Sequence, residues 1–168
     1  MDNFKERLKD IKAFVFDVDG VFSEDMVLHT DGELTRHMNV KDGFAVKTAV
    51  DKGFIVAIIT GGTSVSVKTR FQGLGVTDIY LGSHHKMEDY EDFHMKYNLK
   101  PEQILYMGDD IPDYEPMKAS GLATCPADAV EEILNISHYV SDKDGGKGCV
   151  RDVIEQVLRA QKTWFFYE

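Results

Sequence analysis

The segment Ala13-Phe14-Val15-Phe16-Asp17-Val18-Asp19-Gly20 is the strongest indication of the fold of this chain. An apolar run that leads directly into two carboxylates and a glycine is typical of a strand buried on both faces, with the acids at its C-terminal end. Asp17 and Asp19 are two positions apart and therefore point the same way on an extended chain. Ligands bind at this edge of an open α/β sheet, and buried carboxylates are costly unless a partner such as a hard cation neutralises them. The stretch predicts either an acidic strand end or a catalytic site.

The composition fits one globular domain that spans residues 1–168. The chain has 168 residues, of which 43% are hydrophobic, and this is enough for a substantial core. It contains no run of ~18 apolar residues that would cross a membrane, and the N-terminus lacks the apolar core of a signal peptide. Cys125 and Cys149 are too few for a disulfide framework and have no metal-ligand spacing. We therefore expect a cytoplasmic protein with reduced, structural cysteines.

The net charge limits the possible partners. A formal charge of -10 argues against binding to nucleic acid or to an acidic membrane surface, because phosphate groups are held by dense Lys and Arg. A small anionic substrate remains possible if positive charge is supplied locally. A divalent cation and one or two basic side chains would supply it.

Apolar runs alternate with helical segments along the rest of the chain. Further strands are expected at 54–59, 78–81 and 104–107, with short edge strands at 121–124 and 138–140. Helices are expected at 3–10, 42–52, 64–73 and 86–97, from about 127, and after the glycine-rich loop 145–148; Asp42 is the expected cap of the second helix. This alternation predicts right-handed crossovers, and hence a doubly wound parallel sheet with helices on both faces.

Residues 25–40 interrupt this alternation. Strand-like runs at 26–29 and 34–40 flank Thr30-Asp31-Gly32-Glu33, and Asp-Gly between such runs is a strong hairpin signal. The sequence therefore predicts a β-hairpin inserted between the first strand and the second helix, at the functional edge of the sheet.

The polar residues that follow the strands predict one catalytic site, because the ends of parallel strands meet at one edge. A carboxylate nucleophile, a second carboxyl, a hydroxyl, an ammonium and a distant acidic cluster fit phosphoryl transfer through an aspartyl-phosphate. In chain order these residues are Asp17, Asp19, Thr60, Lys86, Asp109, Asp110 and Asp113.

Each of these residues has an expected role. Asp17 attacks phosphorus, and Asp19 protonates the leaving alcohol and then deprotonates water. Asp17, Asp19 and Asp109 are the expected Mg²⁺ ligands, and Mg²⁺ screens the charge of the nucleophile. Asp110 and Asp113 are expected behind the ligands. Thr60 and Lys86 bind the transferring phosphoryl oxygens.

These motifs resemble those of the haloacid dehalogenase superfamily. The resemblance lies in Asp17-Val-Asp19-Gly after an apolar strand, Thr60-Gly61 after the next, the isolated Lys86, and Gly108-Asp109-Asp110 with Asp113. It implies a Rossmann-like fold of the superfamily's type and a magnesium-dependent reaction. Asp19 separates the phosphatases of this superfamily from the dehalogenases, which lack the second acid.

Over nearly the whole chain, the sequence is similar to the 3-deoxy-D-manno-octulosonate 8-phosphate phosphatase subfamily. The similarity includes the hairpin, residues 39–44, Arg70 and the segment 145–151. It implies a phosphatase without a cap domain that acts in lipopolysaccharide precursor synthesis, as a homotetramer with shared active sites. It also implies that Gly61, Arg70 and Lys86 bind substrate, with Arg70 at the carboxylate of the sugar acid. Relatives often carry Arg after Thr-Gly, whereas this chain has Gly62.

Some alternatives remain open. Phosphatases of nine-carbon sugar acid 9-phosphates share the capless scaffold, and Gly62 does not separate the two substrates. A receiver-like phosphoacceptor domain uses similar residues, but it expects paired acids before an aspartate that ends a later strand. His84 and His85 are more often solvated than functional in such a loop. The aromatic tail at 160–168 packs either on its own subunit or, as the subfamily implies, on a neighbour.

Overall fold

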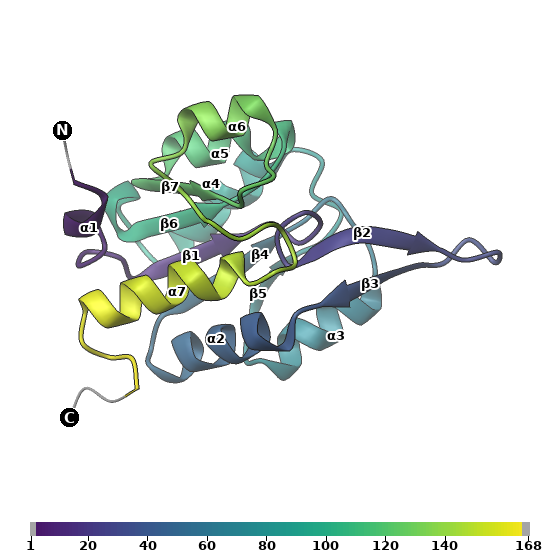
Figure 1. Cartoon of the computed structure of the whole chain (residues 1–168), viewed down its shortest axis with the longest axis horizontal. Coiled ribbons are helices and arrows are strands. Elements are labelled where there is room, and N and C mark those ends of the chain that lie inside the picture. Colours follow the sequence, from purple (N-terminus) through teal and green to yellow (C-terminus); the bar gives the residue numbers. More distant parts are fainter. Residues whose placement is uncertain (1–2, 166–168) are drawn as a thin grey trace.

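The computed structural model describes residues 3–165 and shows a parallel sheet between two layers of helices (Figure 1). The strand order is β5-β4-β1-β6-β7-β8, and every pairing within it is parallel. The strands are β1 (Ala13–Phe16), β2 (Ser23–Leu28), β3 (Leu34–Met38), β4 (Ile55–Ile59), β5 (Asp78–Tyr80), β6 (Ile104–Met107), β7 (Leu122–Cys125) and β8 (Tyr139–Val140). The helices are α1 (Phe4–Arg7), α2 (Val40–Asp51), α3 (Val65–Gly73), α4 (Lys86–Lys96), α5 (Tyr114–Ala119), α6 (Glu131–Ile136) and α7 (Cys149–Ala160), with 3₁₀ turns η1 (Pro101–Gln103) and η2 (Ile111–Asp113).

The decisive strand β1 lies in the middle of this sheet, between β4 and β6. All four of its residues are fully buried. Because side chains alternate along a strand, Phe14 and Phe16 enter the core shared with α2, α3 and α7, whereas Ala13 and Val15 enter the core shared with α4, α5 and α6. Figure 1 shows these two helix layers on opposite faces of the sheet. The predicted doubly wound fold is therefore confirmed.

The predicted hairpin is also confirmed. Strands β2 and β3 pair antiparallel in a sheet of their own, and Figure 1 shows them extending away from the main sheet. All residues of β2 after Ser23 are exposed, because no element within residues 3–165 covers them. A strand pair without a covering layer is marginal in water, so its contacts at the base of the hairpin matter.

The order of the strands corrects one prediction. The segment expected as an edge strand at 121–124 is β7, which lies inside the sheet between β6 and β8. The expectation was wrong because β8, a strand of two residues, covers the outer side of β7. The sequence also gave no indication of α5, whose six residues include Pro116 and are too few for a helical pattern to show.

The start of α2 corrects a second prediction. The N-cap is Asn39, whose side chain accepts a hydrogen bond from the backbone N of Lys41 at 2.8 Å. Asp42 lies in the first turn and instead accepts a hydrogen bond from the backbone N of Arg151 at 2.8 Å, at the start of α7. Burial raises the pKa of Asp42 to about 6, even though the backbone N–H groups of Arg151 and Gly148 favour its charged form. Asp42 thus connects two helices that are distant in sequence.

The described part of the aromatic tail packs on its own chain. Trp164 is 5% exposed and lies edge-on to Phe44 of α2, with ring centroids 6.4 Å apart, while Phe165 stacks on Phe44 at 5.6 Å. Phe166 and Tyr167 lie outside the described residues. None of the helices within 3–165 combines the length and apolar character needed to cross a membrane.

Candidate active site

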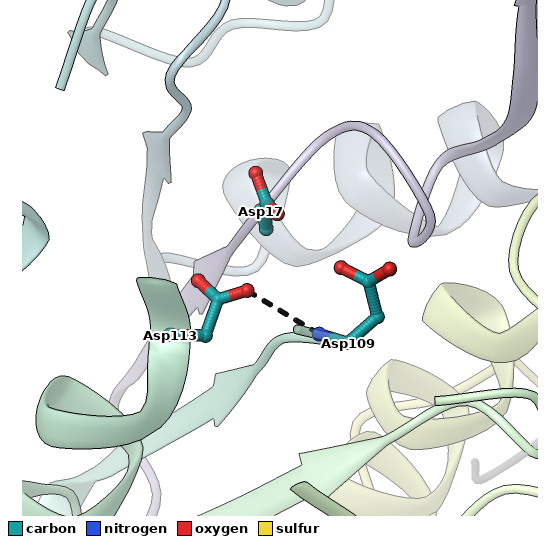
Figure 2. Close-up of side chains that lie close together, drawn as sticks. All are labelled: Asp17, Asp109 and Asp113. Carbon is teal, nitrogen blue, oxygen red and sulfur yellow. Dashed lines mark hydrogen bonds between the residues drawn. The ribbon is translucent and has the colours of Figure 1, made fainter. Parts of the chain in front are cut away.

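Three carboxylates gather where β1 and β6 end. Oxygens of Asp17, Asp109 and Asp113 all lie within 4.8 Å of one another. Asp17 directly follows β1, Asp109 follows the neighbouring β6, and Asp113 lies in η2. Figure 2 shows their side chains converging, with the backbone N of Asp109 donating to Asp113 Oδ2 at 3.3 Å. The fold therefore brings together acids that are as far as 96 residues apart in sequence, as their positions after parallel strands predicted.

One ammonium group lies among these acids. Lys86 Nζ is 3.0 Å from Asp17 Oδ1 and 2.8 Å from Asp113 Oδ1, and the lysine side chain is only 4% exposed. The Tyr106 hydroxyl also donates to Asp113 Oδ1, at 2.8 Å. Asp113 thus positions Lys86 next to Asp17. Three carboxylates against one ammonium leave an excess of negative charge in a buried site, which is costly without a further cation.

The pKa values of Asp17 and Asp109 reflect the same excess of negative charge. Burial raises the pKa of Asp17 well above its ordinary value, and the charge of Asp113 raises it further, while Lys86 opposes both. Burial and the charges of Asp113 and Asp110 raise the pKa of Asp109 to about 7. Asp109 Oδ1 is buried and has no hydrogen-bond partner among residues 3–165. An unpartnered carboxylate oxygen among crowded acids fits a hard cation such as Mg²⁺, which takes oxygen ligands.

The loop after β1 closes directly over Asp109. Gly20 has a φ of +86°, and a Cβ at this position would lie 1.8 Å from Asp109 Oδ2. Only glycine allows both this backbone conformation and this close approach. The glycine-rich loop braces the same turn, because Gly146 N donates to the Val21 carbonyl at 2.9 Å. The loop therefore supports the site by packing.

Asp19 does not belong to the carboxylate cluster. Its two oxygens accept hydrogen bonds from Arg36 of β3, Nε to Oδ1 at 2.5 Å and Nη2 to Oδ2 at 3.1 Å. Ser23 Oγ donates to Oδ1 at 3.3 Å. The expected metal contact of the Asp19 side chain stays a prediction. Sequence reasoning missed Arg36, and only its place in a hairpin at the functional edge pointed towards it.

The loop after β4 forms the opposite side of the site. Thr60 is buried, and its Oγ1 accepts a hydrogen bond from Gly62 N at 3.3 Å. Gly61 and Gly62 line a hollow of about 620 Å³ between this loop and the hairpin, and Arg36 lines it from the hairpin side. A hollow of this volume, beside the loop that follows Thr60, is large enough for a small sugar derivative.

The remaining predicted residues lie farther out. Arg70 is exposed on α3, where a Cβ at Gly43 would lie 2.4 Å from its Nη2, and with Arg36 it lines a smaller hollow of about 330 Å³. Asp110 is exposed and caps η2 by accepting a hydrogen bond from Ile111 N. His84 and His85 are both exposed.

Comparisons with known proteins show the family to which this chain belongs. A model of haloacid dehalogenase-like hydrolases matches residues 67–153. The 3-deoxy-D-manno-octulosonate 8-phosphate phosphatase of Yersinia pestis is 35% identical over 95% of this chain and 86% of its own length. The enzyme of the same name from Escherichia coli K12 is 35% identical over 92% of this chain and 83% of its own.

Solved structures of such phosphatases also superpose closely on this chain. The Yersinia pestis phosphatase superposes with a TM-score of 0.93 at 34% identity, covering 96% of this chain and 88% of its own. The Moraxella catarrhalis phosphatase, solved in complex with a magnesium ion, a phosphate ion and a KDO molecule, gives a TM-score of 0.91 at 32% identity over 96% of this chain and 93% of its own. The buried acidic site and this similarity together show that the chain belongs to the haloacid dehalogenase-like hydrolases, in the family of the 3-deoxy-D-manno-octulosonate 8-phosphate phosphatases.

Proposed function

We propose that this protein hydrolyses 3-deoxy-D-manno-octulosonate 8-phosphate to the free sugar acid and inorganic phosphate, with Mg²⁺ as cofactor, for lipopolysaccharide precursor synthesis. The observation that carries the proposal is the buried pairing of Asp17 with Lys86, at 3.0 Å, beside Asp109 and Asp113. The family supports the same substrate, because a relative covering nearly the whole chain was solved with magnesium, phosphate and KDO.

In the first half of the proposed reaction, a carboxylate oxygen of Asp17 attacks phosphorus. The bond from phosphorus to the C8 oxygen breaks, and protonated Asp19 gives its proton to the departing alkoxide. The products are an aspartyl-phosphate on Asp17 and the free sugar acid. Asp17 and Asp109 would hold Mg²⁺, which when bound neutralises the negative charge between the nucleophile and the phosphate.

In the second half, a water molecule attacks the same phosphorus atom. Asp19, now a carboxylate, takes a proton from this water, and the bond between phosphorus and Asp17 breaks. Phosphate leaves and both aspartates return to their starting forms. Lys86 donates to phosphoryl oxygens in both halves, and its hold on Asp113 keeps its ammonium next to Asp17. Thr60 and Gly61 are proposed to bind the other phosphoryl oxygens.

The sugar acid carries negative charge at both ends, so its site needs two separated positive centres. Lys86 with Mg²⁺ provides the first, and Arg70 is proposed to provide the second, at the carboxylate. Arginine suits a carboxylate because its planar fork donates two parallel hydrogen bonds. Arg70 is exposed on α3 and can therefore also serve a site shared with a neighbouring subunit.

A comparison of substrates tests the proposed function. We expect the highest kcat/KM for the eight-carbon 8-phosphate, and Arg70→Ala should lower this value far more than that for a simple hexose phosphate. Phosphate release should be measured with the eight-carbon 8-phosphate, nine-carbon sugar acid 9-phosphates and hexose phosphates. If a nine-carbon acid wins by tenfold or more, about 1.4 kcal/mol of transition-state binding, the alternative substrate is the correct one.

The protein is proposed to be a homotetramer with shared active sites, and the hairpin supports this. Met26 and Leu28 on β2 and Leu34 on β3 are 46%, 72% and 41% exposed, and contiguous apolar surface at a functional edge marks an interaction site. The proposed location is the cytoplasm, which agrees with two buried cysteines that form no disulfide.

Light scattering tests the assembly. The expected mass is four times the chain mass of 19.0 kDa. Leu28→Asp, which places a charge on the exposed apolar strand, should give smaller species and a higher KM while the main sheet stays folded by circular dichroism. A monomer at working concentration with unimpaired kinetics would rule out the shared sites.

A further inference from the structure

Arg36 forms a bidentate ion pair with Asp19. The guanidinium is carried by a strand of the hairpin, yet its side chain is only 5% exposed, and Nε and Nη2 donate to the two different oxygens of one carboxylate. Its third nitrogen, Nη1, is buried and has no hydrogen-bond partner in the described part of the chain. Burying a guanidinium with one nitrogen unpaired costs free energy of folding. The two hydrogen bonds to Asp19 and the packing around the pair must offset this cost.

Gly62 provides the room for this pair. A Cβ at residue 62 would lie 3.0 Å from Arg36 Nη2 and 3.7 Å from Asp19 Oδ2. Contact at 3.0 Å is tight for a carbon against the edge of a guanidinium, so a side chain at position 62 would push Nη2 away by a few tenths of an ångström. The absence of a side chain at position 62 therefore favours the fork between Arg36 and Asp19.

The hydrogen bonds distinguish the two oxygens of Asp19. A carboxylate has about four acceptor positions, two on each oxygen. Oδ1 accepts from Arg36 Nε and from Ser23 Oγ, so both of its positions are used. Among the donors of residues 3–165, only Arg36 Nη2 donates to Oδ2. The Asp19 side chain is 29% exposed, and its Oδ2 would lie 3.7 Å from a Cβ at Gly62, which is one of the residues that line the hollow. The remaining position on Oδ2 is therefore accessible from the side of Gly62.

We propose that Arg36 is a positioning residue that fixes the carboxylate of Asp19 so that Oδ2 exchanges the proton with the leaving alcohol. The inference rests on the proposed aspartyl-phosphate mechanism. It adds that Oδ2 is the atom of Asp19 that carries the proton and that Arg36 orients this atom. In the first half-reaction the O–H bond at Oδ2 breaks as the alkoxide oxygen gains the proton. The leaving group then lies in the hollow lined by Gly62, with Arg36 stabilising the carboxylate that remains.

Two simple esters separate proton transfer from all other steps. Ethyl phosphate releases a poor leaving group that needs a proton, whereas p-nitrophenyl phosphate releases a stable anion without one. The quantity to compare is kcat/KM, because it covers the reaction only up to the release of the alcohol and excludes hydrolysis of the aspartyl-phosphate, which also uses Asp19.

Arg36→Gln should lower kcat/KM for ethyl phosphate at least tenfold, and that for p-nitrophenyl phosphate by no more than threefold. Arg36→Lys should have a kcat/KM for ethyl phosphate between those of Arg36→Gln and the wild type, because its ammonium group restores the charge but not the two parallel hydrogen bonds. Gly62→Ala should produce the same selective loss with Arg36 still in place. Lys68→Gln, which removes an exposed charge on α3, is the control and should leave the ratio of the two values unchanged.

An equal loss for both esters in Arg36→Gln would overturn the proposal, since a structural role does not distinguish leaving groups. An unchanged ratio in a folded Gly62→Ala variant would also overturn it. Wild-type enzyme that releases phosphate from neither ester nor the sugar acid phosphate would refute the proposed function itself. Because the ratio is measured on simple esters, it tests Arg36 even if the physiological substrate is another sugar phosphate.

Discussion

Asp17→Asn is expected to abolish phosphatase activity, with a loss on the order of 10⁴-fold or more in kcat. The amide of asparagine is not a nucleophile towards phosphorus, so no aspartyl-phosphate can form. The fold should tolerate the change well. Burial and the charge of Asp113 disfavour the carboxylate of Asp17, and Lys86 keeps its contact with Asp113 at 2.8 Å when that carboxylate is removed. The variant should therefore unfold at a temperature no lower than that of the wild type.

This combination of results separates a nucleophile from a structural acid. Activity and thermal unfolding should be measured on the same preparation, with Asp51→Asn as the matched control, because Asp51 lies exposed at the end of α2 and pairs with Lys47 on the same helix. The control should keep full activity. Near-normal turnover in Asp17→Asn would exclude Asp17 as the nucleophile, and a strongly destabilised variant would show that its carboxylate serves the fold.

Removal of magnesium is expected to stop turnover completely, and added Mg²⁺ should restore it. The acids that would hold the ion repel one another in its absence. Burial and the charges of Asp113 and Asp110 raise the pKa of Asp109 to about 7. A bound cation relieves the repulsion in the folded state only. Mg²⁺ should therefore also raise the temperature of unfolding. This second effect is independent of activity.

Asp109→Asn provides the matched comparison. It removes one charge from the site but keeps an oxygen there, so the increase in unfolding temperature with Mg²⁺ should become much smaller and the Mg²⁺ concentration needed for half activity should rise. Asp51→Asn should respond like the wild type. Full activity in excess chelator, with metal excluded by elemental analysis, would contradict the magnesium site.

The parts of the structure that depend on short stretches of sequence could be predicted. β1 reads as a buried strand because its apolar run is continuous, and the hairpin follows from Asp31-Gly32 between two strand-like runs. The gathering of Asp17, Lys86 and Asp109 also followed, because parallel strands place their C-terminal ends at one edge of the sheet.

The parts that depend on pairing between distant segments could not be predicted. Arg36 belongs to the site through a contact across 17 residues, and nothing in the hairpin pattern separates it from His37. Asp42 looked like a helix cap by position, yet its partner is 109 residues away. The inner position of β7 depends on β8, which is too short to show a pattern. These features are set by tertiary packing, which local propensity does not record.

The place of α7 affects how the chain folds during synthesis. This helix supplies Val150, Val153, Ile154, Val157 and Leu158 to the same core as Phe14 and Phe16. A ribosome releases β1 well before α7, so the large side chains of the central strand face an incomplete layer until α7 has emerged. The nascent chain therefore exposes apolar surface until residues 149–160 are available to cover it. Premature termination before residue 149 should yield aggregation-prone fragments rather than a smaller folded domain.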